Sequence, residues 1–553
     1  MRVTSLNSAG KEVFLISDME RLHRFLTLGT MDSCYKVCRT PRSKATEVLD
    51  IREWISEEGQ VTFLDTLLQL DYKEVLYTLY NTKCKKQEPR VFLLAYCSTY
   101  GMHMHPDNEQ MKNLALRIRR SAYELLPDIC SIPTTLFMFN HYYKSLCNIK
   151  YDTKGWNDIH KRSIQSWYND KEPLQLLYQL TKYKNRFGYT HTDMFRLCHI
   201  KADHVDKELI YRYVVKGKID DTLYVSGESD KNVMEFLKDY KQIQTTDMDE
   251  SYIAFLVKKH GMSWEHVPSK MLKSVRVWKV LLENMPPIAF LRNINKLTAL
   301  EIFTKGDDAS YYKYVAINKI QSLYDVHPIQ LMITLKIYSQ GKGMKGKLCW
   351  DPDPDIVDAL DKAFRDQFNI LPNKAINKRV CIAMDVSQSM RGAQVYGAEC
   401  LNAIEACCAM SMVIKQMNQE NTTIMGFSEN FIPLDIDPNL RLDDNLRLIE
   451  NLPFSGTDIS LPFQWAKSKN KEFDVFIVMT DNETNANKIS PMEALQSYRI
   501  KMGIPDCKLV VLATSMTSFT VANPNDKYTL DICGFDSSVP DVIMDFITNT
   551  HCD

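Results

Sequence analysis

The sequence predicts a multidomain protein in which an all-helical body precedes a doubly wound α/β domain. Three observations support this prediction: the length, a change in hydrophobic rhythm near residue 376, and a change in charge at the same place. The chain has 553 residues, which is more than one hydrophobic core accommodates. Its 45% hydrophobic and 25% charged residues are typical of a globular protein. We therefore divide the chain into residues 1–375 and 376–553.

The first 375 residues show apolar side chains at steps of three and four, which is the spacing of amphipathic helices. Short breakers such as MPP at 285–287 separate these segments. Successive helix pairs without a strict sequence repeat favour an irregular helical solenoid of the HEAT kind, and an ordinary globular helical domain is the alternative. Clear examples of the helical pattern are LDTLLQLDYKEVLYTLYN (64–81), MKNLALRIRRSAYELL (111–126), SVRVWKVLLENM (274–285) and DIVDALDKAFRDQF (355–368).

Residues 376–553 alternate strand-like and helix-like segments. Alternation of this kind predicts a parallel sheet with helices on both faces. In such a sheet, ligands bind beyond the carboxyl ends of the strands. The strand-like runs are VCIAM (380–384), TTIMGFS (422–428), DVFIVMT (474–480) and KLVVLAT (508–514). The helix-like segments cover residues 398–417, 459–469, 491–502 and 541–549.

The formal net charge of -1 conceals two parts of opposite sign. Residues 1–375 carry 54 Lys and Arg against 46 Asp and Glu, whereas residues 376–553 carry 14 against 23. Residues 251–350 alone contain 15 basic and 6 acidic side chains. A basic body is a candidate for binding nucleic acid, although mildly basic surfaces are also common in proteins without such a partner.

The sequence disfavours several classes of protein. Neither end resembles a secretory signal, and no apolar run approaches the roughly 20 residues of a membrane span. We therefore expect a cytoplasmic, monomeric protein without a membrane partner, and the sequence leaves open whether it also enters the nucleus. The 15 cysteines contain no CxxC pair, which favours reduced, buried thiols over zinc ligands. We expect no enzymatic activity, because the sequence has no P-loop, no G-x-S-x-G elbow and no histidine placed as a base.

Polar residues gather where the predicted strands of the second part end. Asp385, Ser387 and Ser389 follow the first strand, Thr457 lies in a loop before a helix, and Asp481 ends a later strand. Oxygen ligands of this kind suit a hard cation such as Mg²⁺. The first cluster by itself also fits a turn that caps the next helix, but the three clusters together favour a metal site.

These three clusters resemble the metal-ion-dependent adhesion site of von Willebrand factor A domains. The resemblance implies that the hydroxyls of Ser387, Ser389 and Thr457 contact a divalent cation, for which we expect Mg²⁺. It implies that Asp385 and Asp481 support the cation, often through water. It also implies an open coordination position that accepts a carboxylate from an acidic protein partner.

A second resemblance rests on five segments of the first part. They are SDMERLHRFLTLGT (17–30), EPRVFLLAYCS (88–98), TKYKNRFGYTHTDMFRLCHI (181–200), VWKVLLENMPPIAFLRNINKLT (277–298) and GKGMKGKLCWDPD (341–353). These segments resemble the TROVE module of the Ro autoantigen family, the SS-A/Ro ribonucleoproteins, in which a von Willebrand factor A-like domain also follows. The resemblance implies a ring of HEAT-like helices at 1–375, closed by the A domain at 376–553. It implies binding of small cytoplasmic Y RNAs and of misfolded noncoding RNAs such as 5S ribosomal RNA precursors.

The resemblance assigns Lys182, Arg186 and His199 to the RNA-binding surface. On a helix, Lys182 and Arg186 share one face because they are four residues apart, and both can neutralise phosphates. His199 can hydrogen-bond to an unpaired base or stack on it. Without the resemblance, the two cations fit a solvated helix face and His199 fits a histidine of the core.

Two functions from different classes follow from these observations. The favoured one is an RNA-binding component of a ribonucleoprotein particle that stabilises small RNAs or acts in RNA quality control. The alternative is a protein-interaction scaffold in which the A domain holds an acidic partner through its metal.

Overall fold

The structure, a computed structural model, describes most of the chain from Trp54 to Thr548 and short pieces before Trp54. Between those two residues, the parts that it does not describe are 57–59, 83–86, 103–108, 154, 220–229, 246–248, 324–325, 344–346, 371–377, 393, 396–397, 451, 453–456, 481–488, 515–521, 524–525 and 534–538. Before Trp54, it describes 4–6, 12–14, 18–19, 22, 25–26, 34–36 and 51.

The chain divides into two compact units. We call Arg21–Met31 together with Arg42–Met285 the helical unit. We call Met1–Glu20, Asp32–Pro41 and Pro286–Asp553 together the mixed unit. None of the helices in the described ranges combines the length and the apolar composition that a membrane span requires.

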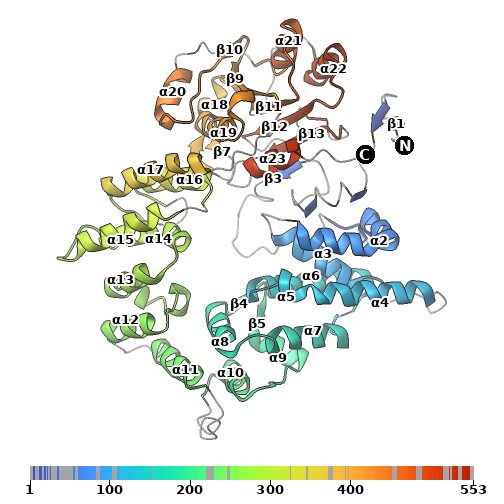
Figure 1. Cartoon of the computed structure of the whole chain (residues 1–553). Coiled ribbons are helices and arrows are strands. Elements are labelled where there is room, and N and C mark those ends of the chain that lie inside the picture. The colour runs from blue at the N-terminus through green and yellow to red at the C-terminus, as the bar shows by residue number, and fades with distance from the viewer. Residues whose placement is uncertain are drawn as a thin grey trace. The chain divides into compact units, whose positions relative to one another are not determined.

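The helical unit contains helices that follow one another as successive layers, coloured from blue to green in Figure 1. Its α-helices are α2 (Thr62–Asn81), α3 (Gln87–Thr99), α4 (Glu109–Glu124), α5 (Leu126–Ile129), α6 (Pro133–Tyr151), α7 (Asp158–Asn169), α8 (Pro173–Lys182), α9 (His191–Cys198), α10 (Val205–Lys216), α11 (Lys231–Gln244), α12 (Glu250–Lys259) and α13 (Val275–Asn284). The 3₁₀ helices η3 (Trp264–His266) and η4 (Met271–Lys273) and the hairpin β4 (Asn185–Arg186) and β5 (Tyr189–Thr190) complete the described elements. The helices predicted at 64–81, 111–126 and 274–285 are confirmed as α2, α4 and α13.

Local side chains determine where these helices begin and end. Asn157 begins α7 by accepting a hydrogen bond from the backbone N–H of His160, and Asp230 begins α11 in the same way. Gly217 ends α10 with φ of 66°, a left-handed conformation that glycine adopts without a steric penalty. These caps satisfy backbone groups that the helices themselves leave without partners.

The mixed unit includes four helices that the sequence analysis assigned to the first part of the chain. They are α14 (Pro287–Ala299), α15 (Ala309–Gln321), α16 (Pro328–Ser339) and α17 (Pro354–Ile370), the last of which was predicted at 355–368. Helix α16 packs against the α/β part, where Lys336 forms an ion pair with Glu405 at 2.8 Å. The amide of Gln340 donates to the carbonyl of Cys400 at 3.3 Å.

The α/β part is a seven-stranded sheet with helices on both faces. The strand order is β10-β9-β6-β11-β12-β13-β3, and the described pairs are parallel except for β10 with β9. The strands are β3 (Cys34–Lys36), β6 (Val380–Asp385), β9 (Thr422–Phe427), β10 (Phe431–Pro433), β11 (Val475–Thr480), β12 (Lys508–Ala513) and β13 (Thr529–Cys533). The helices are α18 (Ser389–Gly392), α19 (Ala403–Met417), η5 (Gln419–Asn421), α20 (Leu442–Glu450), α21 (Leu461–Ser468), α22 (Pro491–Met502) and α23 (Val539–Thr548). Two small antiparallel pairs accompany them, β1 (Thr4–Leu6) with β2 (Glu12–Phe14) and β7 (Gln394–Val395) with β8 (Ala398–Asn402).

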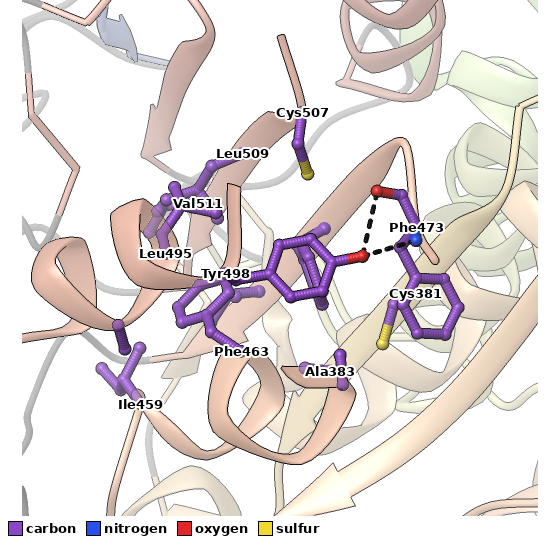
Figure 2. Close-up of a cluster of buried hydrophobic side chains, with 14 of the residues drawn as sticks. Cys381, Ala383, Ile459, Phe463, Phe473, Leu495, Tyr498, Cys507, Leu509 and Val511 are labelled. Atoms are coloured by element: carbon purple, nitrogen blue, oxygen red, sulfur yellow. Dashed lines mark hydrogen bonds between the residues drawn. The ribbon is translucent and has the colours of Figure 1, made fainter. Parts of the chain in front are cut away.

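Both faces of the central strands are buried, which explains their continuous apolar runs. Cys381 and Ala383 of β6 face the cluster that α21 and α22 form over the sheet, as Figure 2 shows. Met384, on the opposite face of the same strand, lies 3.2 Å from the hydroxyl of Ser411 in α19. The alternation of side chains along each strand thus separates two cores.

The predicted fold class is confirmed, with corrections at some element boundaries. The segment 398–417 is not one helix, because Ala398–Asn402 forms β8 before α19 begins. Asn402 and Glu405 form a capping box at that point, so the helix starts where the backbone N–H groups find side-chain partners. The strands β3 and β13 were missed. β3 is an edge strand that joins the sheet from a position far away in the sequence, and β13 lies between β3 and β12.

We expect Tyr498→Phe to lower the stability of the mixed unit by about 1–3 kcal/mol. The Tyr498 side chain is fully buried, and its hydroxyl accepts a hydrogen bond from the backbone N–H of Phe473 at 2.6 Å (Figure 2). It also lies 3.0 Å from the carbonyl of Lys471. Removal of the hydroxyl leaves the buried N–H without this partner. Chemical denaturation measures the loss, and Tyr314→Phe, at a side chain that is 63% exposed, should change stability by less than about 0.5 kcal/mol.

Candidate functional site

The candidate metal centre lies at the carboxyl edge of the parallel sheet. Asp385 ends β6, and Thr480 ends the neighbouring strand β11 in the same register. The hydroxyl of Thr480 donates to Oδ2 of Asp385 at 3.0 Å, and the backbone N–H of Ser387 donates to Oδ1 at 2.9 Å. Because both oxygens of this fully buried carboxylate are engaged, its orientation is fixed. Sequence reasoning missed Thr480, although it is the polar residue that ends the apolar run at 474–480.

Ser387 and Ser389 place two hydroxyls side by side next to this carboxylate. Their Oγ atoms lie 3.0 Å apart, with Ser387 buried and Ser389 exposed. Neighbouring oxygens around an octahedral Mg²⁺ are also about 3 Å apart, because each lies about 2.1 Å from the ion. The hydroxyl pair therefore fits two adjacent coordination positions as well as it fits a hydrogen bond.

Thr457 belongs to the same sheet edge. The backbone N–H of its neighbour Asp458 donates to the carbonyl of Ser428 at 3.0 Å. Ser428 directly follows Phe427, which is the register partner of Asp385 in β9. Thr457 is buried, as Ser387 and Asp385 are. Asp481, the fifth residue predicted for this site, lies outside the described residues.

The described donors of this centre are all oxygen atoms, which is the chemistry that a hard cation requires. Asp385 supplies negative charge from the buried interior, while the hydroxyls of Ser387, Ser389 and Thr457 are neutral ligands. The residues present therefore fit a divalent cation. Such a centre can hold an oxygen ligand of a partner, because neutral hydroxyls leave most of the positive charge of the ion available.

The segment predicted to bind RNA is not a single helix. Helix α8 ends at Lys182, and Tyr183 forms its C-cap. Arg186 lies in β4 of a short hairpin, so the prediction that Lys182 and Arg186 share a helix face is wrong. Both cations nevertheless lie in one short segment of the helical unit, which runs from the end of α8 to the first strand of the hairpin. Lys182 is half-buried, with its Nζ 5.2 Å from the centre of the Tyr183 ring, and Arg186 is exposed.

The hairpin contains a two-residue turn at Phe187 and Gly188. Both residues have positive φ, 51° and 77°, as the turn type that fits the twist of a hairpin requires. Glycine tolerates this conformation, whereas Phe187 is strained in it. The ring of Phe187 lies 6.2 Å from that of His141 in α6. Arg186 therefore stands immediately before a strained turn that contacts the body of the helical unit.

His191 anchors the chain on both sides of the hairpin. It is the first residue of α9, and its Nε2 lies 2.8 Å from the carbonyl oxygen of Tyr183 at the end of α8. Its Nδ1 lies 2.9 Å from the hydroxyl of Tyr168. Burial lowers the pKa of His191 to about 4, so the ring is neutral and donates through one nitrogen while it accepts through the other. Sequence reasoning missed His191, because a histidine in this pattern has no distinguishing signal.

His199 lies at the opposite end of α9, about 12 Å along the helix axis from the hairpin. It is exposed and has φ of 53° and ψ of 45°, so it ends the helix in the left-handed conformation. The amide of Gln165 donates to the carbonyls of Cys198 at 2.7 Å and His199 at 3.3 Å, which fixes this turn. An exposed imidazole is available to a ligand, and the alternative of a core histidine is excluded.

Two family models together cover nearly the whole chain. The TROVE domain matches residues 5–334, and the Ro60 vWA domain matches residues 379–547. The first match alone covers more than half of the chain.

The chain belongs to the Ro60 family.

Relatives of known name extend this likeness over the full length. The RNA-binding protein RO60 of Caenorhabditis elegans is 30% identical over 98% of this chain and 90% of its own length. The RNA-binding protein RO60 of Deinococcus radiodurans is 28% identical over 98% of this chain and 94% of its own length. Both names describe RNA-binding proteins rather than enzymes. The crystal structure of the Ro (RSR) protein of Deinococcus radiodurans has a TM-score of 0.80 to this structure at 27% identity, covering 96% of this chain and 99% of that chain.

The comparisons confirm that the chain contains the two domains that the resemblances suggested. Membership of the Ro60 family confirms the TROVE module, and the α/β part is a Ro60-type von Willebrand factor A domain. The site residues within these domains are a separate matter, since likeness over a domain does not by itself assign a role to Lys182 or Ser387. Their geometry supports the proposals that follow.

We expect the anchoring contact of His191 to make the helical unit sensitive to acid. The unfolded histidine titrates near pH 6.5, whereas the folded one has a pKa of about 4. The folded-state pKa is the lower one, so the stabilisation is present above pH 6.5 and is lost as the pH falls toward 4. The free energy of unfolding of the unmodified chain, relative to that of His191→Gln, should fall by up to about 1.4 kcal/mol per pH unit across this window. A difference that is constant between pH 7 and pH 4 would contradict the assignment.

Proposed function

We propose that this chain is the RNA-binding component of a cytoplasmic ribonucleoprotein particle. Its ligands would be small noncoding RNAs, both stable ones of the Y RNA kind and misfolded ones such as 5S ribosomal RNA precursors. Binding would stabilise the former and sequester the latter for quality control. Entry of the protein into the nucleus is compatible with this role.

The observation that carries the proposal is likeness over 98% of the chain to two proteins named RNA-binding protein RO60. The likeness extends through both the TROVE domain and the A domain, so it is not the likeness of one common module. A relative that shares a whole architecture is a better guide to function than a shared fold alone.

The geometry around the hairpin supports a surface for phosphates. Lys182 ends α8 and Arg186 lies in the first strand of the hairpin, and His191 fixes the Tyr183 cap between them by its contact with the Tyr183 carbonyl. Cations on a fixed frame lose less conformational entropy when they bind than cations on a mobile loop do. His199 is exposed at the other end of α9, where it is available to an unpaired base farther along the RNA.

The A domain supports a second, separate role. We propose that Ser387, Ser389 and Thr457 hold Mg²⁺, with Asp385 and Asp481 supporting it, and that the ion accepts an oxygen ligand. This centre favours the alternative function of a metal-dependent scaffold for an acidic protein partner, and the two roles are compatible in one chain.

We expect Lys182→Ala combined with Arg186→Ala to weaken binding of a small structured RNA. With each phosphate contact that is lost, RNA binding releases fewer counterions. The negative slope of log K against log salt should therefore become shallower by about one unit per contact. The melting temperature should stay nearly unchanged, because Arg186 is exposed and Lys182 is only half-buried, and substitutions outside the core have small effects on stability. Gel-shift titrations at several salt concentrations measure both the affinity and the slope.

The matched control removes one lysine and one arginine elsewhere in the helical unit. Lys73 in α2 and Arg117 in α4 are both exposed, so Lys73→Ala with Arg117→Ala makes the same change in net charge. Equal losses of affinity in the two double variants would show that net charge, rather than the hairpin, governs binding. No loss in either variant would refute the placement of the RNA surface.

We expect Mg²⁺ to raise the melting temperature of the full chain. An ion that binds the native state stabilises it by mass action, by about 2.7 kcal/mol at one hundred times its Kd. The triple variant Ser387→Ala, Ser389→Ala and Thr457→Ala should lose this response, because it removes the proposed hydroxyl ligands. Differential scanning calorimetry with and without Mg²⁺ measures the response.

The control for this experiment is the triple variant Thr304→Ala, Ser322→Ala and Ser468→Ala. These three hydroxyl side chains are exposed in the same mixed unit, so their removal matches the chemistry without touching the centre. The control should respond to Mg²⁺ as the unmodified chain does. Melting curves of the unmodified chain that do not depend on Mg²⁺ would rule out the metal.

A further inference from the structure

The helical unit contains a pocket of about 520 Å³ that sequence reasoning did not anticipate. Its wall is formed by α8, by α11 and by the end of α12, and it includes Gln175, Tyr178, Asn232 and Phe236. Pockets that bind small ligands have volumes of roughly 300–1,000 Å³, so this one is large enough for a single nucleotide base.

The pocket and the proposed phosphate contact lie on one face of α8. Leu174 and Tyr178 line the pocket and are four residues apart, and the same step leads from Tyr178 to Lys182. The Nζ of Lys182 is 5.9 Å from the centre of the Tyr178 ring. One turn of helix, about 5.4 Å, therefore separates the wall of the pocket from the cation. An RNA backbone at Lys182 has a base within reach of Tyr178.

The charges around the pocket do not favour a phosphate inside it. The Nζ of Lys259 lies 2.7 Å from oxygens of both Glu235 and Asp239, so its charge is already matched by two carboxylates. The Nε2 of His260 lies 2.7 Å from the same oxygen of Asp239. Burial opposes ionisation of Asp239, but hydrogen bonds from Lys259 and His260 outweigh it and lower its pKa. Glu235 in the wall would repel a phosphate, and Lys259 is already matched by two carboxylates, whereas a neutral base would not be repelled.

The remaining wall has the chemistry that recognises a base. The Tyr178 ring is held by its hydroxyl, 3.4 Å from the carbonyl of Gly261, and by the ring of Phe236 at 6.3 Å. Aromatic side chains that are fixed in this way stack on unpaired bases. Gln175 and Asn232 are exposed at the rim, and each offers both donors and acceptors to the edge of a base.

We propose that this pocket accepts an unpaired base of the RNA whose backbone contacts Lys182. The inference rests on the proposed function and specifies it, since it assigns the ligand at this surface to single-stranded rather than fully paired RNA. Tyr178 stacks on the base, Gln175 and Asn232 contact its edge, and Lys182 neutralises the neighbouring phosphate.

The test compares two short single-stranded RNAs of equal length on the full chain by fluorescence anisotropy. One is oligoadenylate, and the other has the same ribose–phosphate backbone without bases. The unmodified chain should bind oligoadenylate about 5- to 150-fold more tightly, which is the range for stacking of one base. Gln175→Ala with Asn232→Ala should reduce this ratio, and Tyr178→Leu should bring it close to one. Lys182→Ala should weaken both RNAs equally and leave the ratio unchanged.

The controls separate failure of the pocket from failure of the proposed function. Gln110→Ala with Asn113→Ala removes two exposed amides from α4 and should leave the ratio unchanged. The amide pair of the pocket is exposed, so its removal tests the inference even if Tyr178→Leu does not fold. A ratio that the pocket variants leave unchanged, with binding that still depends on Lys182 and Arg186, overturns the pocket alone. An unmodified chain that binds neither oligoadenylate nor structured RNA overturns the proposed function as well.

Discussion

A polar group that is taken out of water must find a hydrogen-bond partner, and the candidate metal centre depends on this constraint. The carboxylate of Asp385 is fully buried at the end of β6, where the hydroxyl of Thr480 and the backbone N–H of Ser387 satisfy it. The same two bonds join neighbouring strands and begin the turn that carries Ser387 and Ser389. The hydrogen bonds of Asp385 therefore fix both the pairing of β6 with β11 and the positions of the two serine hydroxyls.

The same constraint shapes the surface proposed for RNA. The imidazole of His191 is buried beneath the hairpin, and its two nitrogens pair with the carbonyl of Tyr183 and the hydroxyl of Tyr168. This pairing ties the end of α8 to the start of α9, so that Lys182 and Arg186 project from a fixed frame. Each unit thus positions its candidate site residues by satisfying a buried polar group next to them. The two surfaces differ in chemistry, since one offers cations and the other offers neutral oxygens.

Much of this architecture follows from local sequence patterns. The strands β6, β9, β11 and β12 and the helices α2, α4, α13 and α17 appear at the predicted residues, because apolar periodicity reports directly which side of an element is buried. The order of these elements specifies a doubly wound sheet, and that topology locates the ligand edge at its carboxyl end. The candidate metal ligands among the described residues could therefore be named without a structure. So could the family, because motifs in a fixed order are more specific than any one of them.

Other features depend on contacts between segments that are distant in the sequence, and periodicity contains no information about those. The end of α8 at Lys182 is one example, because the hairpin that follows is held by His191 and by the body of the helical unit rather than by its own propensity. A second example is the grouping of α14–α17 with the α/β part. It depends on contacts such as the ion pair between Lys336 and Glu405. The pocket beside Tyr178 arises where α8, α11 and α12 meet. Local patterns in the sequence were thus enough to predict most of the central elements, their order and the family, whereas contacts between distant segments decided which side chains lie together.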